Sequence, residues 1–232
     1  MTPYQYAGSE LELFEQARNW KAYFRRVIEP YLQGSVLEVG AGLGANTREF
    51  ANLDFDHWTC LEPDSALLEQ IRVGVPPLDR HDLALGTLDS LDPARRFDAI
   101  LYIDVLEHIE DDFRELREAA KRLAAGGALI VLAPAHSWLF TPFDRAIGHY
   151  RRYDKESLEA VAPRGLRIEK LIYLDSVGLL ASLGNRLVLN SSMPTSAQIQ
   201  TWDRLLVPCS RVLDPLLAGT VGKSVVGVWR NV

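Results

Sequence analysis

The chain has 232 residues, 47% of them hydrophobic and 24% charged, which is the composition of an ordinary globular protein with room for one α/β domain. Its 25 Lys and Arg against 31 Asp and Glu give a formal net charge of −6. This balance argues against nucleic acid as the main partner, because phosphate binding needs concentrated positive charge.

Cysteine usage and hydropathy bear on location. The only cysteines, Cys60 and Cys209, have neither metal-ligand spacing nor the pattern of a disulfide framework. The first residues carry no signal-peptide pattern, and no run approaches the roughly 20 apolar residues of a membrane-spanning helix. We therefore expect a cytoplasmic protein without stable membrane insertion.

Taken in chain order, the sequence first predicts one or two helices over residues 10–32. Short apolar runs then alternate with helical patterns, which is typical of a parallel sheet covered by helices. Strands are expected at 35–40, 57–63, 82–88, 97–103 and 127–134, and helices at 45–52, 64–73 and 111–124. Gly126 and Gly127 are expected to stop the last of these helices.

The alternation ends after residue 134, where a long irregular connection is expected. Two more strands are predicted at 166–174 and 224–230, with a largely helical segment between them that Pro208 and Pro215 interrupt. The first five strands should be parallel and the last two should form an antiparallel edge. We expect one α/β domain over 1–232, with a helical cap at 1–33, a core at 34–174, an insertion or lid at 175–223 and a last strand at 224–232.

A glycine-rich loop follows the first strand in the sequence "VLEVGAGLGANT". Gly40, Gly42 and Gly44 allow a tight turn and close approach of a ligand, beside the free N–H groups of a helix N-terminus. Gly40, Gly42 and Ala45 also satisfy the dinucleotide pattern, so NAD is an alternative ligand. In both interpretations Glu62, at the end of the second strand, accepts hydrogen bonds from ribose hydroxyls.

Two features favour another nucleotide over NAD. Glu38 lies inside the strand, where a carboxylate is costly to bury without a cationic partner, and an aminoacyl ammonium group passing over the loop would provide one. Over 30 residues precede the first strand, whereas dinucleotide enzymes usually begin close to it. An NAD-dependent oxidoreductase and a non-catalytic nucleotide-binding partner protein remain alternative functions.

Four segments in register resemble the class I S-adenosylmethionine-dependent methyltransferases: "LEVGAGLGANT", "CLEPD", "LGTLDSL" and "FDAILYIDVLEHIEDD", within residues 17–134. The resemblance implies a Rossmann-like doubly wound sheet of seven strands with an antiparallel C-terminal hairpin. It implies S-adenosyl-L-methionine as cofactor and S-adenosyl-L-homocysteine as product. The cofactor-binding residues that it implies are Glu38, Gly40, Ala41, Gly42, Gly44, Asn46, Glu62, Pro63, Gly86, Thr87, Leu88, Asp104 and Val105, with Trp20 and Tyr23 folded over the cofactor.

This sequence departs from the family's pattern at one position and leaves one role open. Many members have an acidic residue at the position of Thr87 that binds the adenine amino group, so here the Thr87 hydroxyl or the Leu88 backbone would have to serve. Trp20 and Tyr23, three residues apart on one helical face, suit the protein core equally well.

Asp104, Glu107 and His108 follow the fourth strand, where ligands lie in open parallel sheets. Two carboxylates and an imidazole suit Mg²⁺, Mn²⁺ or Zn²⁺. However, "DVLEH" is also a common connector in metal-free relatives, so no metal is predicted. His108 is a candidate general base, with helix capping as its alternative role.

The connection after the fifth strand contains "IGHYRRYDKESL" (147–158). His149 can titrate near neutrality and is predicted to be the base that deprotonates the acceptor, with Tyr153 as a further catalytic candidate. The substrate-binding candidates are His136, Arg151, Arg152 and Tyr6. In the structural alternative, Asp144 or Asp154 pairs with an arginine, Asp154 caps the next helix and Tyr153 packs in the core.

The sequence thus predicts an enzyme of small-molecule biosynthesis that methylates an O or N atom by in-line displacement. Arginines suit a carboxylate or phosphate through bidentate pairing, which favours an anionic acceptor. The protein is expected to be a monomer or homodimer that does not bind nucleic acid.

Overall fold

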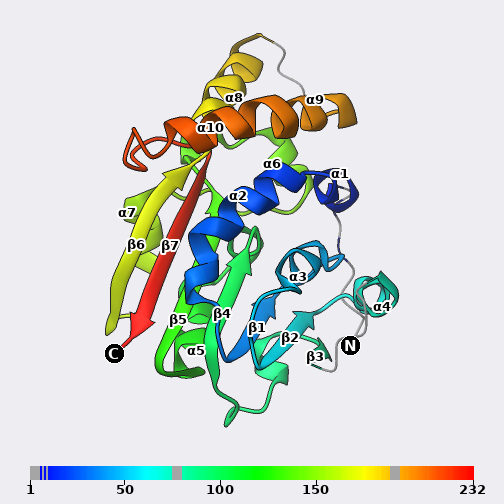
Figure 1. Cartoon of the computed structure of the whole chain (residues 1–232), viewed down its shortest axis with the longest axis vertical. Coiled ribbons are helices and arrows are strands. Elements are labelled where there is room, and N and C mark those ends of the chain that lie inside the picture. Colours follow the sequence, from blue (N-terminus) through cyan, green and yellow to red (C-terminus); the bar gives the residue numbers. More distant parts are fainter. Residues whose placement is uncertain (1–5, 7, 9, 75–79, 189–193) are drawn as a thin grey trace.

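The computed structural model describes residues 6, 8, 10–74, 80–188 and 194–232, with residues 185–188 described for their backbone only. Within these residues seven strands form one sheet in the order β3-β2-β1-β4-β5-β7-β6 (Figure 1). The strands are β1 (Ser35–Val39), β2 (His57–Glu62), β3 (His81–Leu85), β4 (Phe97–Ile103), β5 (Leu123–Pro134), β6 (Leu166–Leu174) and β7 (Ser224–Asn231).

The pairing of the strands confirms the predicted fold class. Strands β1 to β5 pair in parallel, whereas β7 runs antiparallel to both β5 and β6. The inner strands read as nearly continuous apolar runs because both faces of the sheet are covered there, whereas the edge strands β3 and β6 are only partly buried. Since the chain winds outward from β1 in both directions, the carboxyl ends of β1 and β4 meet at the point where ligands bind in such sheets.

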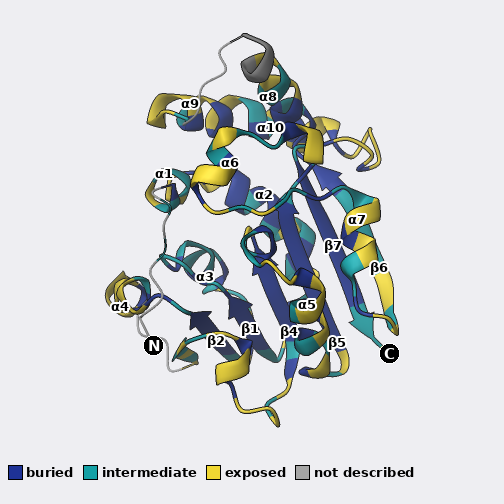
Figure 2. Cartoon of the chain, turned by 180° about the vertical axis from the view of Figure 1, so that it is seen from behind, coloured by how far each residue is buried: buried dark blue, intermediate teal, exposed yellow. Residues whose placement is uncertain are grey.

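Each face of the sheet has its own hydrophobic core. On one face Phe24, Phe50 and Ile71 pack from α2 (Arg18–Ile28), α3 (Ala45–Phe50) and α4 (Ser65–Gly74). On the other face Leu116 and Leu158 pack from α5 (Asp112–Lys121) and α7 (Lys155–Val161). Figure 2 shows β1, β2, β4, β5 and β7 buried between these layers, whereas much of the edge strand β6 and the outer sides of α4, α5 and α7 are not buried.

Helices from the predicted insertion form a roof above the carboxyl ends of the strands (Figure 1). The roof consists of α8 (Ser176–Val188), α9 (Ser196–Thr201), a π-helical turn η5 (Trp202–Leu206) and α10 (Val207–Leu213). Below it lie α1 (Leu11–Glu15), α2 and α6 (Pro142–Ala146). Three short 3₁₀ turns also join the core elements: η2 (Leu88–Ser90), η3 (Leu106–His108) and η4 (Ser137–Leu139), and a fourth, η1 (Glu29–Tyr31), follows α2.

Buried carboxylates fasten the roof to the N-terminal helix. Asp203 of η5 accepts hydrogen bonds from the backbone N–H groups of Asn19 (3.2 Å) and Trp20 (2.9 Å), so it caps the N-terminus of α2 across the sequence. Asp214 accepts from the Tyr23 hydroxyl (2.7 Å) and from the backbone at the start of α8. The cap and the insertion therefore act as one packed unit.

The structure differs from the sequence predictions at two helices. Helix α5 ends at Lys121 rather than near Gly126, because Leu123 is buried and pairs with Phe97 at the start of β5. Pro208 does not interrupt the helical segment: the wide π turn η5 comes before it, and Pro208 then occupies the first turn of α10, where its missing N–H costs little.

No helix among the described residues combines the length and the apolar character that crossing a membrane requires.

Candidate active site

A cavity of about 740 Å³ lies at the carboxyl ends of β1, β4 and β5, beneath the roof. This volume is in the range of small-molecule and cofactor sites. The predicted site residues that line it are Tyr6, Trp20, Gly40, Ala41, Gly42, Asn46, Asp104, His108, His149 and Arg152. Folding thus places the glycine loop and the "GHYRR" segment around one space.

The glycine loop has the backbone conformation that its sequence predicts. Gly40, Gly42 and Gly44 all have positive φ (67°, 56° and 71°), which strongly favours glycine. A Cβ atom on Gly40 would lie 2.7 Å from the side chain of Val105, so this turn packs against the loop after β4. Val105 therefore supports the loop from below and does not itself line the cavity.

Glu62, at the end of β2, braces the same loop. Its side chain is buried; Oε2 accepts a hydrogen bond from the Gly42 N–H (2.8 Å) and Oε1 accepts one from the Asp64 N–H (3.0 Å). Burial raises the pKa of Glu62, and these two backbone hydrogen bonds oppose that shift. Asp64 in turn accepts from the Tyr6 N–H (2.8 Å), which holds the N-terminal segment across this end of the sheet.

The predicted adenine side of the site lies outside the lining of the cavity. The cavity wall contains none of the five residues predicted for the ribose and adenine, which are Glu62, Pro63, Gly86, Thr87 and Leu88. Leu88 is buried, and its carbonyl accepts a hydrogen bond from Arg122 (2.9 Å). The ribose and adenine roles of these residues stay predictions.

Glu38 has protein partners where the sequence suggested a ligand. It is 1% exposed, it is absent from the cavity wall, and Oε2 accepts from the Thr47 hydroxyl (2.6 Å) and the Trp58 indole N–H (3.0 Å). Burial raises its pKa to about 7, because these donors are neutral and only partly compensate for lost hydration. The carboxyl group therefore fixes the strand to helix α3 and β2.

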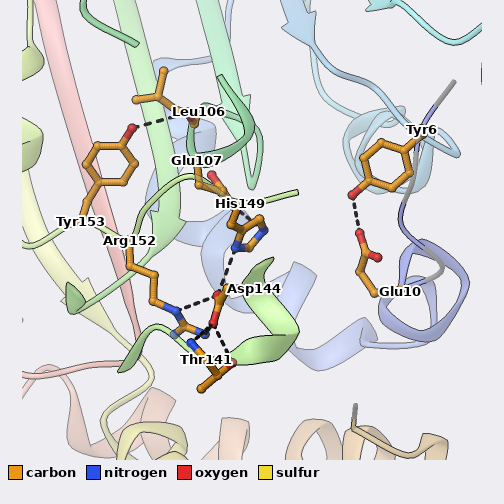
Figure 3. A network of polar contacts seen from close by, with 9 residues as sticks. All are labelled: Tyr6, Glu10, Leu106, Glu107, Thr141, Asp144, His149, Arg152 and Tyr153. Carbon is orange, nitrogen blue, oxygen red and sulfur yellow. Dashed lines mark hydrogen bonds and ion pairs between the residues drawn. The ribbon is translucent and has the colours of Figure 1, made fainter. Parts of the chain in front are cut away.

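His149 is held by a network centred on Asp144 (Figure 3). Asp144 is fully buried and accepts from His149 Nδ1 (3.0 Å), from Arg152 Nε (2.8 Å) and Nη2 (3.0 Å), and from the Thr141 N–H (2.8 Å). Although burial alone would raise it, the pKa of Asp144 is lowered because His149 and Arg152 hydrogen-bond to the carboxylate. The network fixes the imidazole so that Nε2 is directed away from Asp144.

The cavity wall beside His149 carries Asp104, Glu107 and His108 from the loop after β4. Asp104 adopts a left-handed conformation (φ 53°) and is exposed to the cavity, where partial loss of hydration raises its pKa although His149 and Lys223 oppose the shift. Glu107 is 0% exposed, and burial, with the charge of Asp104, raises its pKa well above its usual range. Burial also lowers the pKa of His108 to about 3, so this imidazole is neutral.

Two lysines of the cavity wall were missed by sequence reasoning. Lys21 donates to the backbone carbonyls of Phe14 (2.6 Å) and Glu15 (3.0 Å), and burial lowers its pKa to about 8. Lys223 lies over the Trp202 ring (4.7 Å to the centroid), and burial lowers its pKa. For Lys21 the sequence offered one signal of a buried position, because this lysine stands between aromatic residues on a predicted buried helix face. Nothing in the sequence marked Lys223.

Several predicted residues lie away from the cavity. Tyr153 is buried in the core on the α5 and α7 face and donates to Asp112 (2.6 Å), and Arg151 pairs with the same carboxylate (2.6 Å). His136 contacts the Gly222 carbonyl (2.9 Å), and Tyr23 bonds Asp214. The packing of Tyr153 and the pairing of Arg152 with Asp144 correspond to the structural alternative, whereas Arg151 pairs with Asp112, a partner that this alternative did not include.

Asp154 fulfils the capping role that this alternative assigned to it. Its carboxylate accepts a hydrogen bond from the Ser157 N–H (2.8 Å) at the start of α7. The "RRYD" segment after His149 thus serves mainly to anchor the loop.

Comparison with known proteins agrees with this architecture. Residues 37–129 match the profile of the methyltransferase domain family. The fold, the glycine loop and this match support a class I S-adenosylmethionine-dependent methyltransferase, as the resemblance of the sequence implied. A similar curated protein is the ubiquinone biosynthesis O-methyltransferase of Paramagnetospirillum magneticum, 30% identical over 120 residues. That alignment covers 49% of this chain and 47% of the relative, so the chain spans about half the length of the curated enzyme that it matches.

Solved structures share the fold over nearly the whole chain. An S-adenosylmethionine-dependent methyltransferase from Mesorhizobium loti has a TM-score of 0.62 and 17% identity, covering 94% of this chain and 99% of its own. The N-methyltransferase NodS from Bradyrhizobium japonicum, solved in complex with S-adenosyl-L-homocysteine, has a TM-score of 0.59 and 17% identity, covering 94% and 87%. At these identities the likeness concerns the fold.

Proposed function

We propose that this protein transfers the methyl group of S-adenosylmethionine to an oxygen or nitrogen atom of a small-molecule acceptor. The observation that carries the proposal is a cavity that is lined both by the glycine loop and by His149 with its Asp144 network. A cofactor at the loop and an acceptor beside His149 would share one space that is walled off by the roof.

The loop residues fit the cofactor. Gly40, Ala41, Gly42 and Asn46 line the cavity, and the loop opens helix α3, so its backbone can approach a bound nucleoside closely. Glu62 holds the loop in this conformation from the adjacent strand. When bound, the cofactor supplies an electrophilic methyl group on a sulfonium, and the residues around it bind and orient the two reactants.

His149 is the residue that we propose to activate the acceptor. Its side chain is 8% exposed, its Nδ1 is fixed by a carboxylate and its Nε2 faces the cluster on the cavity wall. Positioning is the main need of a methyl displacement, because little covalent help is required from the protein. Activation matters when the acceptor is a hydroxyl or a protonated amine.

The cationic groups of the wall bear on the acceptor's charge. Arg152 is engaged with both oxygens of Asp144, so it does not offer the free fork that the sequence interpretation gave it. Lys223 and Lys21, the latter also donating to two backbone carbonyls, line the same cavity, and they support an anionic or phenolic acceptor. The name of the curated relative, an O-methyltransferase of ubiquinone biosynthesis, supports an oxygen acceptor.

A cytoplasmic location is part of the proposal. Both thiols are free, with Cys60 buried and Cys209 exposed, which suits a reducing compartment. We propose a monomer or homodimer that has no nucleic-acid partner.

Calorimetric titration with S-adenosylhomocysteine, with NAD run in parallel, tests the proposed function. We expect micromolar binding of the former and none of the latter. Binding of NAD alone would make the protein an oxidoreductase candidate, and binding of neither would indicate a degenerate site that depends on a partner chain.

A further inference from the structure

We propose that Glu107, His108 and His149 form a binding site for one divalent transition-metal ion on the wall of the cavity. One ligand atom from each of these three residues lies within 4.8 Å of the other two. Glu107 and His108 belong to the turn η3 after β4, and His149 comes from the loop after α6. The proposed role of the ion rests on the proposed function, but its binding does not.

Glu107 is the first sign of a missing ligand. It is 0% exposed, and neither Oε1 nor Oε2 has a hydrogen-bond partner among the described residues. The Nε2 atom of His149 lies 3.8 Å from Oε1, beyond hydrogen-bond distance. Burying a carboxyl group without partners is unfavourable, and buried charges in proteins are usually paired or coordinate metals. Because Glu107 also lines the cavity, an ion bound there could contact its oxygens.

The second sign is the orientation of His149. Histidines that bind metals almost always donate their other ring N–H to a carboxylate or carbonyl, which fixes the ring and its tautomer. Here Nδ1 lies 3.0 Å from Asp144 Oδ1, and Asp144 is itself fixed by Arg152. This leaves Nε2 as the free ligand atom on the side of Glu107 (Figure 3).

His108 completes the cluster. Its ring meets the ring of His149 edge to face, with centroids 4.5 Å apart. The Tyr6 ring, 5.7 Å from His108, covers the cluster from the N-terminal segment.

The ligand set indicates the kind of ion. Two imidazoles and one carboxylate are the ligands of catalytic zinc and non-haem iron sites, whereas Mg²⁺ prefers oxygen ligands and water. Three protein ligands leave coordination positions open, and all three residues line the cavity. An oxygen-bearing acceptor could therefore complete the coordination, and His149 would act on it through the ion. This refines the sequence prediction of a direct base and departs from the expectation of no metal.

The test uses the full chain after treatment with chelator and exhaustive dialysis. Calorimetric titration with Zn²⁺, and separately with Mn²⁺ and Mg²⁺, should give one equivalent of tightly bound Zn²⁺ and weaker binding of Mg²⁺. Co²⁺ should bind with visible absorption bands of a site that includes imidazole. Glu107→Gln, which preserves size, and His108→Ala should each weaken Zn²⁺ binding by about 10-fold or more.

His57→Ala is the matched control, because His57 and Asp82 form another imidazole–carboxylate pair, 2.6 Å apart, at the start of β2 and β3. This variant should bind Zn²⁺ like the parent protein. Absence of stoichiometric Zn²⁺ binding would overturn the site, as would binding that Glu107→Gln and His108→Ala leave unchanged in folded protein, verified by thermal melting.

S-adenosylhomocysteine titrations of the same samples separate this site from the proposed function. A protein that binds S-adenosylhomocysteine but does not bind Zn²⁺ would retain the methyltransferase proposal and overturn the metal site. A protein that binds Zn²⁺ but does not bind S-adenosylhomocysteine would retain the metal site and overturn the methyltransferase proposal.

Discussion

Replacing Glu62 by alanine tests the cofactor side of the site most directly. The carboxylate holds the backbone N–H groups of Gly42 and Asp64 at 2.8 and 3.0 Å, and the resemblance assigns it the ribose as well. Hydrogen bonds to a charged group contribute about 1.5–3 kcal/mol each. Loss of the ribose contact alone should therefore weaken S-adenosylhomocysteine binding by about 10- to 150-fold.

The assay is calorimetric titration of the variant with S-adenosylhomocysteine, paired with thermal unfolding of the ligand-free protein. Because Glu62→Ala also leaves two loop N–H groups without their acceptor, the melting temperature should fall together with affinity. Glu69→Ala, which removes an exposed carboxylate of helix α4 that pairs with Arg72, should change neither. An unchanged dissociation constant in Glu62→Ala would refute the role of Glu62 in binding.

Three further outcomes follow from the structure. Burial lowers the pKa of Lys21 from 10.5 in the unfolded chain to about 8 in the folded protein. Between these values the unfolded state binds more protons, so the free energy of unfolding should rise with pH from 8 to 9.5. Denaturant unfolding of Lys21→Met should show a smaller rise. A thiol reagent should modify only Cys209 in the folded protein, because burial raises the pKa of Cys60 and shields it, and two thiols reacting at once would contradict this packing. Asp203→Ala should remove the cap of α2 and cost about 1–2 kcal/mol, visible as a melting temperature lower by about 2–4 °C per kcal/mol; an unaltered melting curve would count against the cap.

The fold could be predicted closely because its signals are local. Buried parallel strands appear in the sequence as apolar runs, and the glycines after the first strand mark a turn that few other residues can form. The predicted helix and strand boundaries were wrong where tertiary contacts determine them. Leu123 continues a helical pattern, but pairing with Phe97 places it in β5.

The site could be predicted in part for the same reason. Asp104 and His108 follow the end of β4, so the topology of the sheet brings them to its carboxyl edge, and His149 reaches the same edge from the long connection after β5. Tyr153 lies away from the cavity because its backbone pairs with the end of β5: its N–H donates to the Pro134 carbonyl (3.0 Å), and its side chain enters the core. Lys223 reaches the cavity through contacts distant in sequence, which no local pattern encodes.

The cap that Asp203 provides also has a consequence for biosynthesis. Helix α2 leaves the ribosome early, whereas the carboxylate that accepts its Trp20 N–H is made 183 residues later. Until residues 203–214 have been translated, the growing chain can form the glycine loop but not the roof, so its aromatic face around Trp20 stays without its partner Trp202. The roof over the cavity, and with it the cover of this aromatic face, can therefore form only late in synthesis.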